Sequence, residues 1–214
     1  MQNVWESEWD ELIRFAHRNV IAGVNKSEAT HCIDQIFANI IQLFVGSMNV
    51  RDEWKYFLGS YTNFKYYSGM ARSQKLELDF NFGLYEGQFC LETFFVHPYR
   101  IRYMNDKFWE HLIELNNCGS CKFIENAGLA GDKGKLIDKY TSSNSNVFNI
   151  IKNYLLLEIF GGGSGDLGGV EVTWPMAIDR NELLVNGATA MFHMYKMNYL
   201  LHRSYRQYLC RLKK

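Results

Sequence analysis

The sequence predicts an α+β fold: a mostly helical single domain with a small antiparallel β-sheet. Apolar residues recur at a three-four spacing in several long segments, whereas residues 76–82 alternate apolar and polar positions. A chain of 214 residues that is 47% hydrophobic can bury a sizeable core without disulfides or a metal. The sequence shows no internal repeat and no long linker, so residues 1–214 are expected to form one compact domain.

Two amphipathic helices are predicted at the start of the chain, joined as an antiparallel hairpin. The first covers residues 4–21. The second can be capped by Ser27 and ended by Gly46, and its apolar stripe consists of Ile33, Ile36, Phe37, Ile40, Ile41 and Phe44. The aromatic-rich residues 54–67 that follow are not assigned to a helix or to a strand.

A β-hairpin is predicted next. Every second residue of 76–82 is apolar, which is typical of a strand with one buried face. Glycines at 83 and 87 can turn the chain, residues 89–96 can return antiparallel, and Pro98 ends the pairing because it has no N–H to donate. Helical spacing resumes at residues 105–116, and residues 118–134 are expected to form a loop.

The last third predicts a helix, a strand and a second helix. The apolar residues 147–160 suit a buried helix, and Val170, Val172 and Trp174 alternate with polar residues as in a strand. Residues 181–211 are the longest predicted helix, with a buried side made of Leu184, Ala188, Met191, Phe192, Tyr195, Tyr199 and Leu200.

The glycine-rich stretch at residues 163–168, GSGDLG, matches the spelling of a dinucleotide-binding loop. Such a loop joins a strand to the N-terminus of a helix, whose free N–H groups hold the pyrophosphate. Here a predicted helix precedes the glycines and a predicted strand follows them. A helix-to-strand connection is therefore the favoured interpretation, and no cofactor is assigned.

Two further groups of residues could carry chemistry. Cys118 and Cys121 have the C-x-x-C spacing of zinc and redox sites, but no second ligand pair accompanies them, so two free thiols are favoured. Glu77, Asp79 and Glu92 could hold a metal if the hairpin brings them together, although ordinary outward-facing strand polarity is the simpler interpretation. Glu110, His111 and Glu114 are expected to form a solvated helix face. No catalytic or metal-binding residue is assigned.

The charge and the composition of the chain limit which partners and which cellular compartment are expected. The chain has 23 Lys and Arg and 23 Asp and Glu, so no long-range field attracts it to nucleic acid or to a membrane. It lacks a predicted signal peptide and a membrane span, and its five cysteines suggest free thiols in a reducing cytoplasm. The cationic tail suits the C-terminal end of a helix or an acidic partner: His202, Arg203, Arg206, Arg211, Lys213 and Lys214.

The C-terminal third resembles a known family. Its apolar helix, its GSGDLG turn, its short strand ending at Trp174 and its long helix with Tyr195 and Tyr199 are similar to the ending of immunity proteins of bacterial polymorphic and contact-dependent growth inhibition toxin systems. The resemblance implies a cytoplasmic antitoxin-like inhibitor that binds one cognate toxin C-terminal domain, in some cases a nuclease, and blocks its active site. It brings no catalytic residues with it.

Three hypotheses for the function follow. The leading one is an immunity protein that acts through protein–protein interaction and has no chemistry of its own. The first alternative is a metal-dependent hydrolase or nuclease that uses Glu77, Asp79 and Glu92. The second alternative is a structural interaction protein of phage or bacterial origin.

Overall fold

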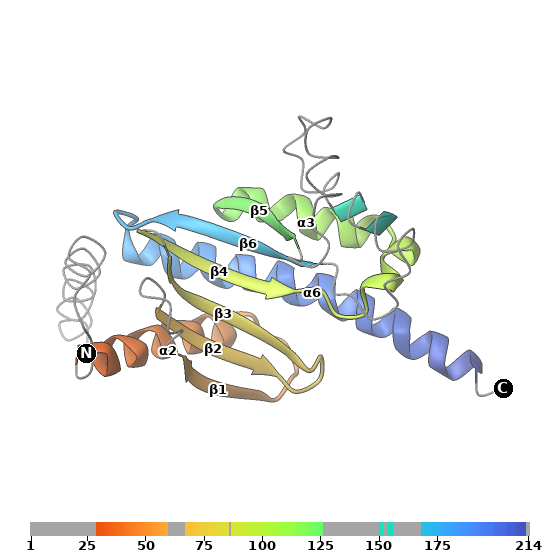
Figure 1. Ribbon diagram of the computed structural model, residues 1–214, viewed down its shortest axis with the longest axis horizontal. Coiled ribbons are helices and arrows are strands. Elements are labelled where there is room, and N and C mark those ends of the chain that lie inside the picture. The colour runs from red at the N-terminus through yellow and green to blue at the C-terminus, as the bar shows by residue number, and fades with distance from the viewer. Residues whose placement is uncertain are drawn as a thin grey trace. The chain divides into compact units, whose positions relative to one another are not determined.

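The computed structural model describes residues 29–59, 67–85, 87–125, 150–151, 154–155 and 168–212. Figure 1 shows their secondary structure along the chain. The elements are α2 (Ala29–Ser47), β1 (Trp54–Gly59), β2 (Tyr67–Ser73), β3 (Leu78–Tyr85), β4 (Gln88–Phe94), the 3-10 helix η1 (Pro98–Tyr103), α3 (Asp106–Cys118), β5 (Ser120–Glu125), β6 (Gly168–Pro175) and α6 (Arg180–Leu212).

The predicted fold class is wrong about the size of the sheet. Six strands form one antiparallel sheet in the order β1-β2-β3-β4-β6-β5. Helix accounts for 54% and strand for 29% of the described residues, so the description "mostly helical with a small sheet" does not hold. The strands that the prediction lacked are β1, β2 and β5, which have no regular alternation of large apolar and polar residues.

The chain divides into two compact units. The first consists of Met1–Glu92 and Thr173–Met191, and the second of Thr93–Val172 and Phe192–Lys214. Strands β4 and β6 and helix α6 contribute residues to both units, because each is continuous across a boundary. The expectation of one compact domain stays a prediction.

In the first unit, α2 packs on β1, β2 and β3 (Figure 1). Four residues of the predicted apolar stripe, Phe37, Ile40, Ile41 and Phe44, are buried, whereas Ile36 is only partly buried. The rings of Phe37 and Phe44 meet Phe82 of β3 edge-on, with centroids 5.5 and 5.0 Å apart. The helix ends at Ser47 and not at Gly46, and Asn49 is the residue that adopts positive φ, at 48°.

The close contact between α2 and β2 depends on a small residue. A Cβ atom added at Gly69 would lie 2.6 Å from backbone atoms of Phe37 and Ala38. Gly69 therefore lets the strand approach the helix backbone directly, and it also explains why β2 lacks the large alternating side chains that predict a strand.

The predicted β3–β4 hairpin is confirmed, with a shorter turn than expected. Strand β3 extends through Gly83 to Tyr85, and Gly87 has a φ of 77° in the turn before β4. Leu78, Phe80 and Phe82 are buried, as the alternation predicts, but Asn81, at a position predicted to face solvent, is buried as well. Glu77 lies outside the strand, in the turn from β2 to β3.

In the second unit, three buried phenylalanines pack together. Phe95 follows β4, and its ring lies 6.1 Å from Phe108 of α3 and 6.4 Å from Phe123 of β5, measured between centroids. The predicted helix at residues 105–116 is confirmed as α3, but the loop predicted at 118–134 is wrong for residues 120–125, which form β5.

The predicted C-terminal helix is confirmed as α6, although its buried side is shifted from the predicted one. Met191 and Tyr195 are buried as predicted, but the other predicted residues are only partly buried: Leu184, Ala188, Phe192, Tyr199 and Leu200. The fully buried positions, of which only Met191 was predicted, are Leu183, Ala190, Met191, Met194, Met197, Asn198 and Leu201. The predicted strand around Val170 is confirmed as β6.

Several predictions lie outside the described residues: the helix at 4–21, the helical hairpin and the glycine turn at 163–167. Ile150, Ile151, Tyr154 and Leu155 are helical, as predicted for that segment. Within the described ranges, no helix combines the length and the apolar character needed to cross a bilayer.

Candidate functional site

The three carboxylates proposed as a metal site, Glu77, Asp79 and Glu92, each have a different environment in the structure. Arg72 Nη1 donates to both oxygens of Asp79 at 3.0 Å, across the β2–β3 pair. Glu92 of β4 accepts a bond of 3.4 Å from Asn81 Nδ2, and Glu77 is exposed in the β2–β3 turn with a φ of 53°. No group of three His, Cys, Asp or Glu in the described part of the chain could hold a metal ion.

The two cysteines of the C-x-x-C spacing lie at different elements. Cys118 is the last residue of α3 and Cys121 lies on β5, and both are free thiols. Burial raises the pKa of Cys118 to about 11 and that of Cys121 to about 12. Because the thiolate is the form that attacks disulfides and binds metals, neither sulfur is prepared for that chemistry at neutral pH.

His111 was expected to lie on a solvated helix face, but its ring is half-buried and contacts another histidine. Its Nδ1 atom lies 2.9 Å from Nδ1 of His193 on α6, and both rings are half-buried. The sequence could not supply this contact because the two residues are 82 positions apart. Glu114 stays exposed and accepts a bond of 2.8 Å from Asn117 Nδ2.

The strongest candidate for a binding site lies in the second unit, where η1 meets the C-terminal part of α6. Pro98 favours the start of η1 because its ring fixes φ, and His97 turns the chain before it in the left-handed conformation, at φ 47°. Ile101 is the buried residue of this short helix. The tyrosine and arginine side chains of η1 are consequently left at or near the surface.

A buried amide holds α6 beside this segment. Asn198 is fully buried; its Oδ1 accepts a bond of 2.9 Å from the backbone N–H of Val96, and its Nδ2 donates to the carbonyl of Met194 at 3.1 Å. The bond fixes the chain one residue before His97. A buried donor left without its acceptor is costly, so Asn198 specifies the position of the segment.

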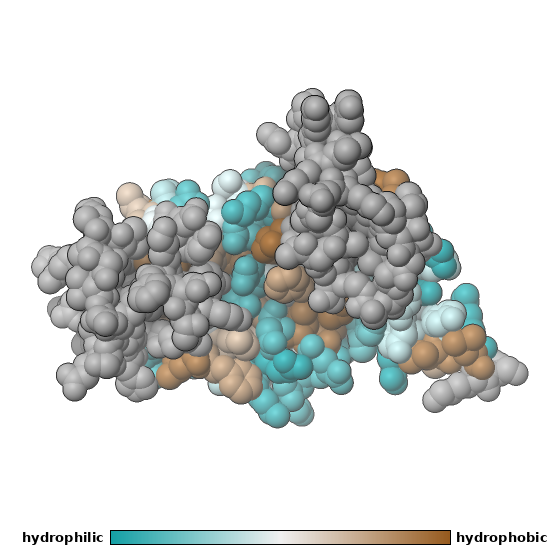
Figure 2. All heavy atoms as spheres, in the orientation of Figure 1, coloured by the Kyte–Doolittle hydropathy of each residue, from teal (hydrophilic) through white to brown (hydrophobic). Residues whose placement is uncertain are grey.

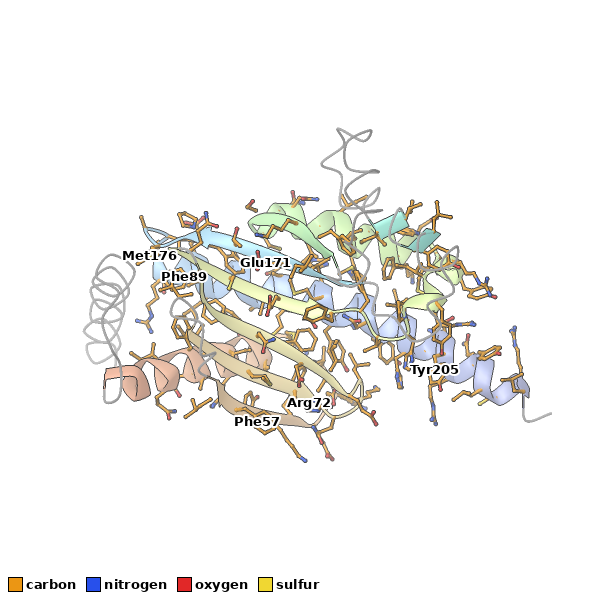
Figure 3. The ribbon with its side chains drawn as sticks, in the orientation of Figure 1. Phe57, Arg72, Phe89, Glu171, Met176 and Tyr205 are labelled. Carbon is orange, nitrogen blue, oxygen red and sulfur yellow. The ribbon has the colours of Figure 1, made fainter. Side chains whose placement is uncertain are left out.

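Stacked rings and one arginine continue the contact along α6. The ring of His97 stacks on that of Tyr205, with centroids 3.9 Å apart and planes at 24° (Figure 3 labels Tyr205). Arg100 donates from Nε and Nη2 to Ser204 Oγ at 3.2 and 3.0 Å. Its guanidinium also lies 4.2 Å above the ring of Tyr103 and 5.0 Å from the ring of Tyr208.

We call this set the Tyr–Arg surface; it consists of Tyr99, Arg100, Arg102, Tyr103, Tyr205 and Tyr208. Three of its tyrosines are exposed although they are large: Tyr99 by 38%, Tyr103 by 54% and Tyr208 by 41%. Burial raises the pKa of Tyr99, so its hydroxyl stays protonated and can donate a hydrogen bond. At the end of α6 the surface is more apolar, and Leu212 is 65% exposed there (Figure 2).

The charge of these segments has one sign. Residues 97–103 and 192–212 contain no Asp or Glu, and their cations are Arg100, Arg102, Lys196, Arg203, Arg206 and Arg211. The cations of the tail were predicted as a group from the sequence, but their neighbours in η1 were not. A signal was present in the sequence, because "PYRIRY" and "YRQY" both interleave tyrosine with arginine.

The arrangement is suited to binding and not to bond breaking. Tyrosine and arginine are the residue types enriched at the energetic centres of protein interfaces, and Arg100 is already held in place by Ser204 and two rings. A side chain that is ordered before binding loses less conformational entropy when a partner arrives. No protein-family model matches the chain, and neither a curated protein nor a solved structure matches it.

Proposed function

We propose that this chain is an immunity protein that binds a cognate bacterial toxin domain and neutralises it by covering its active site. The resemblance of the C-terminal third supplies the class of partner. The observation that carries the proposal is the Tyr–Arg surface, which presents exposed tyrosines and ordered arginines without a neighbouring acid in the segments that form it. The cytoplasm, where such a toxin would act, is the proposed compartment.

The charge of the surface defines what the toxin domain must offer. Arginine guanidinium groups pair best with carboxylates, in many cases with two parallel hydrogen bonds, and exposed tyrosine rings add apolar contact area at little entropic cost. The proposed partner therefore presents Asp and Glu around an apolar centre. The attraction works locally, because the chain as a whole has a formal net charge of zero.

The hydrolase alternative depends on carboxylates that converge on one point. Asp79 is instead paired with Arg72, whose guanidinium occupies the place where a cation would bind. Glu77 and Glu92 lie on different segments, in the β2–β3 turn and on β4. These contacts favour the binding function, in which the polar side chains of β2 and β3 stabilise the sheet.

The test is co-expression with each reading frame that neighbours the gene, together with measurement of cell growth. We expect one neighbouring frame to be toxic by itself and harmless with this chain, and the two proteins to copurify. Rescue should be lost in the double variant Tyr103→Ala/Tyr208→Ala, with an affinity at least tenfold weaker because two exposed anchors are removed.

The matched control is Tyr56→Ala, which removes a tyrosine of β1 that is 39% exposed and lies far from η1 in the sequence. This variant should rescue growth as well as the original chain. If no neighbouring frame is neutralised, the immunity function is refuted. If rescue occurs but the double variant keeps it, the function stands and the assignment of the Tyr–Arg surface is wrong.

A further inference from the structure

The hydrogen bond between His111 and His193 requires a proton on one Nδ1 atom and no proton on the other. The two Nδ1 atoms are 2.9 Å apart, which is a hydrogen-bond distance, and the ring centroids are 5.2 Å apart. A neutral imidazole carries one N–H, and a protonated imidazole carries two. One Nδ1 atom must therefore hold a proton while the other presents its lone pair.

We propose that His111 and His193 share one proton in a pH-sensitive contact that joins α3 to α6 in the second unit. With both rings neutral, one Nδ1–H donates to the other ring. One added proton, placed on an Nε2 atom, leaves this hydrogen bond intact and makes it charge-assisted. A second added proton puts N–H groups on both Nδ1 atoms, so the hydrogen bond is lost and two cations face each other.

The surroundings oppose the second proton. Burial lowers the pKa of both histidines, and the charges of His193, Lys196 and Lys107 lower that of His111 further. Lys196 is held nearby, with its Nζ atom 5.1 Å from the centroid of the Phe192 ring, and that ring meets His111 edge-on at 6.1 Å. Glu114 is the acidic group that acts on both histidines, in the opposite direction, but its exposure to solvent weakens the effect.

The direction of the pH effect follows from these contacts. Histidines of the unfolded chain accept protons as the pH falls through about 6.5. The folded pair resists them, so over this range the unfolded state binds more protons than the folded state and stability falls with the pH. Well above that range both states are neutral, and the pair adds no pH dependence. The contact is therefore stable near neutrality and weakened in acid.

The first experiment is nitrogen-15 NMR of the histidine rings in the intact protein at pH 8. Free neutral histidine favours the tautomer with the proton on Nε2, whereas the shared proton requires one of these two rings to carry it on Nδ1. We expect one Nδ1–H tautomer, assigned to His111 or His193. Two Nε2–H tautomers would overturn the proposal, and this readout requires no variant to fold.

The second experiment is urea unfolding between pH 8 and pH 5. For the original chain, the pair should contribute up to about a tenfold rise in the unfolding equilibrium constant for each pH unit below about 6.5, which corresponds to one excluded proton. His193→Asn removes one titrating ring and keeps a hydrogen-bonding side chain, so its slope should be smaller by about one proton.

The matched control is His97→Asn, which removes a different histidine of the same unit. His97 has a φ of 47°, a conformation that asparagine tolerates well, so the variant should fold and keep the full contribution of the His111–His193 pair. Equal slopes for His193→Asn and the original chain would contradict the proposal, as would an equal loss of slope in both variants.

Discussion

Asp52 is the residue that organises the turn between β2 and β3 in the first unit. Its Oδ2 accepts a bond of 2.6 Å from Ser73 Oγ, and its Oδ1 accepts from the backbone N–H groups of Glu53 at 2.7 Å and Lys75 at 3.1 Å. Ser73 is fully buried, and its hydroxyl oxygen accepts in turn from the N–H of Leu76 at 3.0 Å. One carboxylate thus satisfies a hydroxyl and two backbone donors.

We expect Asp52→Ala to destabilise the protein by about 1–3 kcal/mol, because it leaves the buried hydroxyl of Ser73 without its acceptor. The measurement is the urea midpoint at pH 7. Glu53→Ala is the control, since the side chain of Glu53 is exposed and its carbonyl, which accepts from Gln74 N–H at 2.9 Å, remains. A midpoint shift of similar size in both variants would show that the turn does not depend on Asp52.

At the scale of elements, the sequence predicted α2, α3, α6 and the β3–β4 hairpin because each has a regular period of apolar residues. Strand β2 has none, since its buried positions Ala71 and Ser73 are small residues and Gly69 lies directly against the backbone of α2. Strand β1 has exposed apolar residues on both faces, such as Tyr56 and Phe57, so no alternation marks it. The residue types in these strands depend on contacts with segments that are distant in the sequence. Those contacts cannot be identified from the local pattern of residues.

The same limit applies to the candidate site. The cations of the tail can be recognised in the sequence, but the surface they belong to also includes η1. That helix is about 100 residues earlier and is joined to α6 through Arg100 and Ser204. The buried side of α6 was misplaced for a related reason. Asn198 is polar but fully buried because it binds Val96, so a rule that assigns polar residues to the surface moves the buried stripe around the helix.

The α2–β2 contact gives a prediction at the scale of elements. Gly69→Ala should destabilise the protein by about 1–3 kcal/mol, because the new methyl group would meet the backbone of α2, which cannot rotate away. Gly46→Ala is the matched control on α2 itself: nothing lies within 4 Å of an added Cβ there. That variant should raise stability by up to about 0.5–1 kcal/mol, since alanine favours a helix.

Thermal or urea unfolding of both glycine variants provides the comparison. We expect the changes in the free energy of unfolding to have opposite signs in the two variants. The substitution is the same at both positions, and only the space around them differs. A stable Gly69→Ala variant would mean that β2 and α2 do not lie in direct backbone contact.

At the scale of the whole molecule, a net charge of zero conceals an uneven distribution along the chain. Cations and anions are equal in number, yet residues 97–103 and 192–212 carry cations and no acid. A charged partner responds to the nearest charges, because the Debye length is only about 10 Å at 0.1 M salt. The binding of anions to the protein should therefore depend on the local charge of these segments and not on the net charge of the chain.

This predicts that the protein binds a sulfonate cation-exchange resin at pH 7 and low salt although its formal net charge is zero. Arg203→Glu/Arg206→Glu reverses two exposed charges on α6 and should elute at clearly lower salt. Arg51→Glu/Lys55→Glu reverses two exposed charges of the first unit and changes the net charge by the same amount, so it separates local from total charge. We expect it to elute between the original chain and the α6 variant; coincident elution of the two variants would show that total charge controls binding and that the cations beside η1 do not act together.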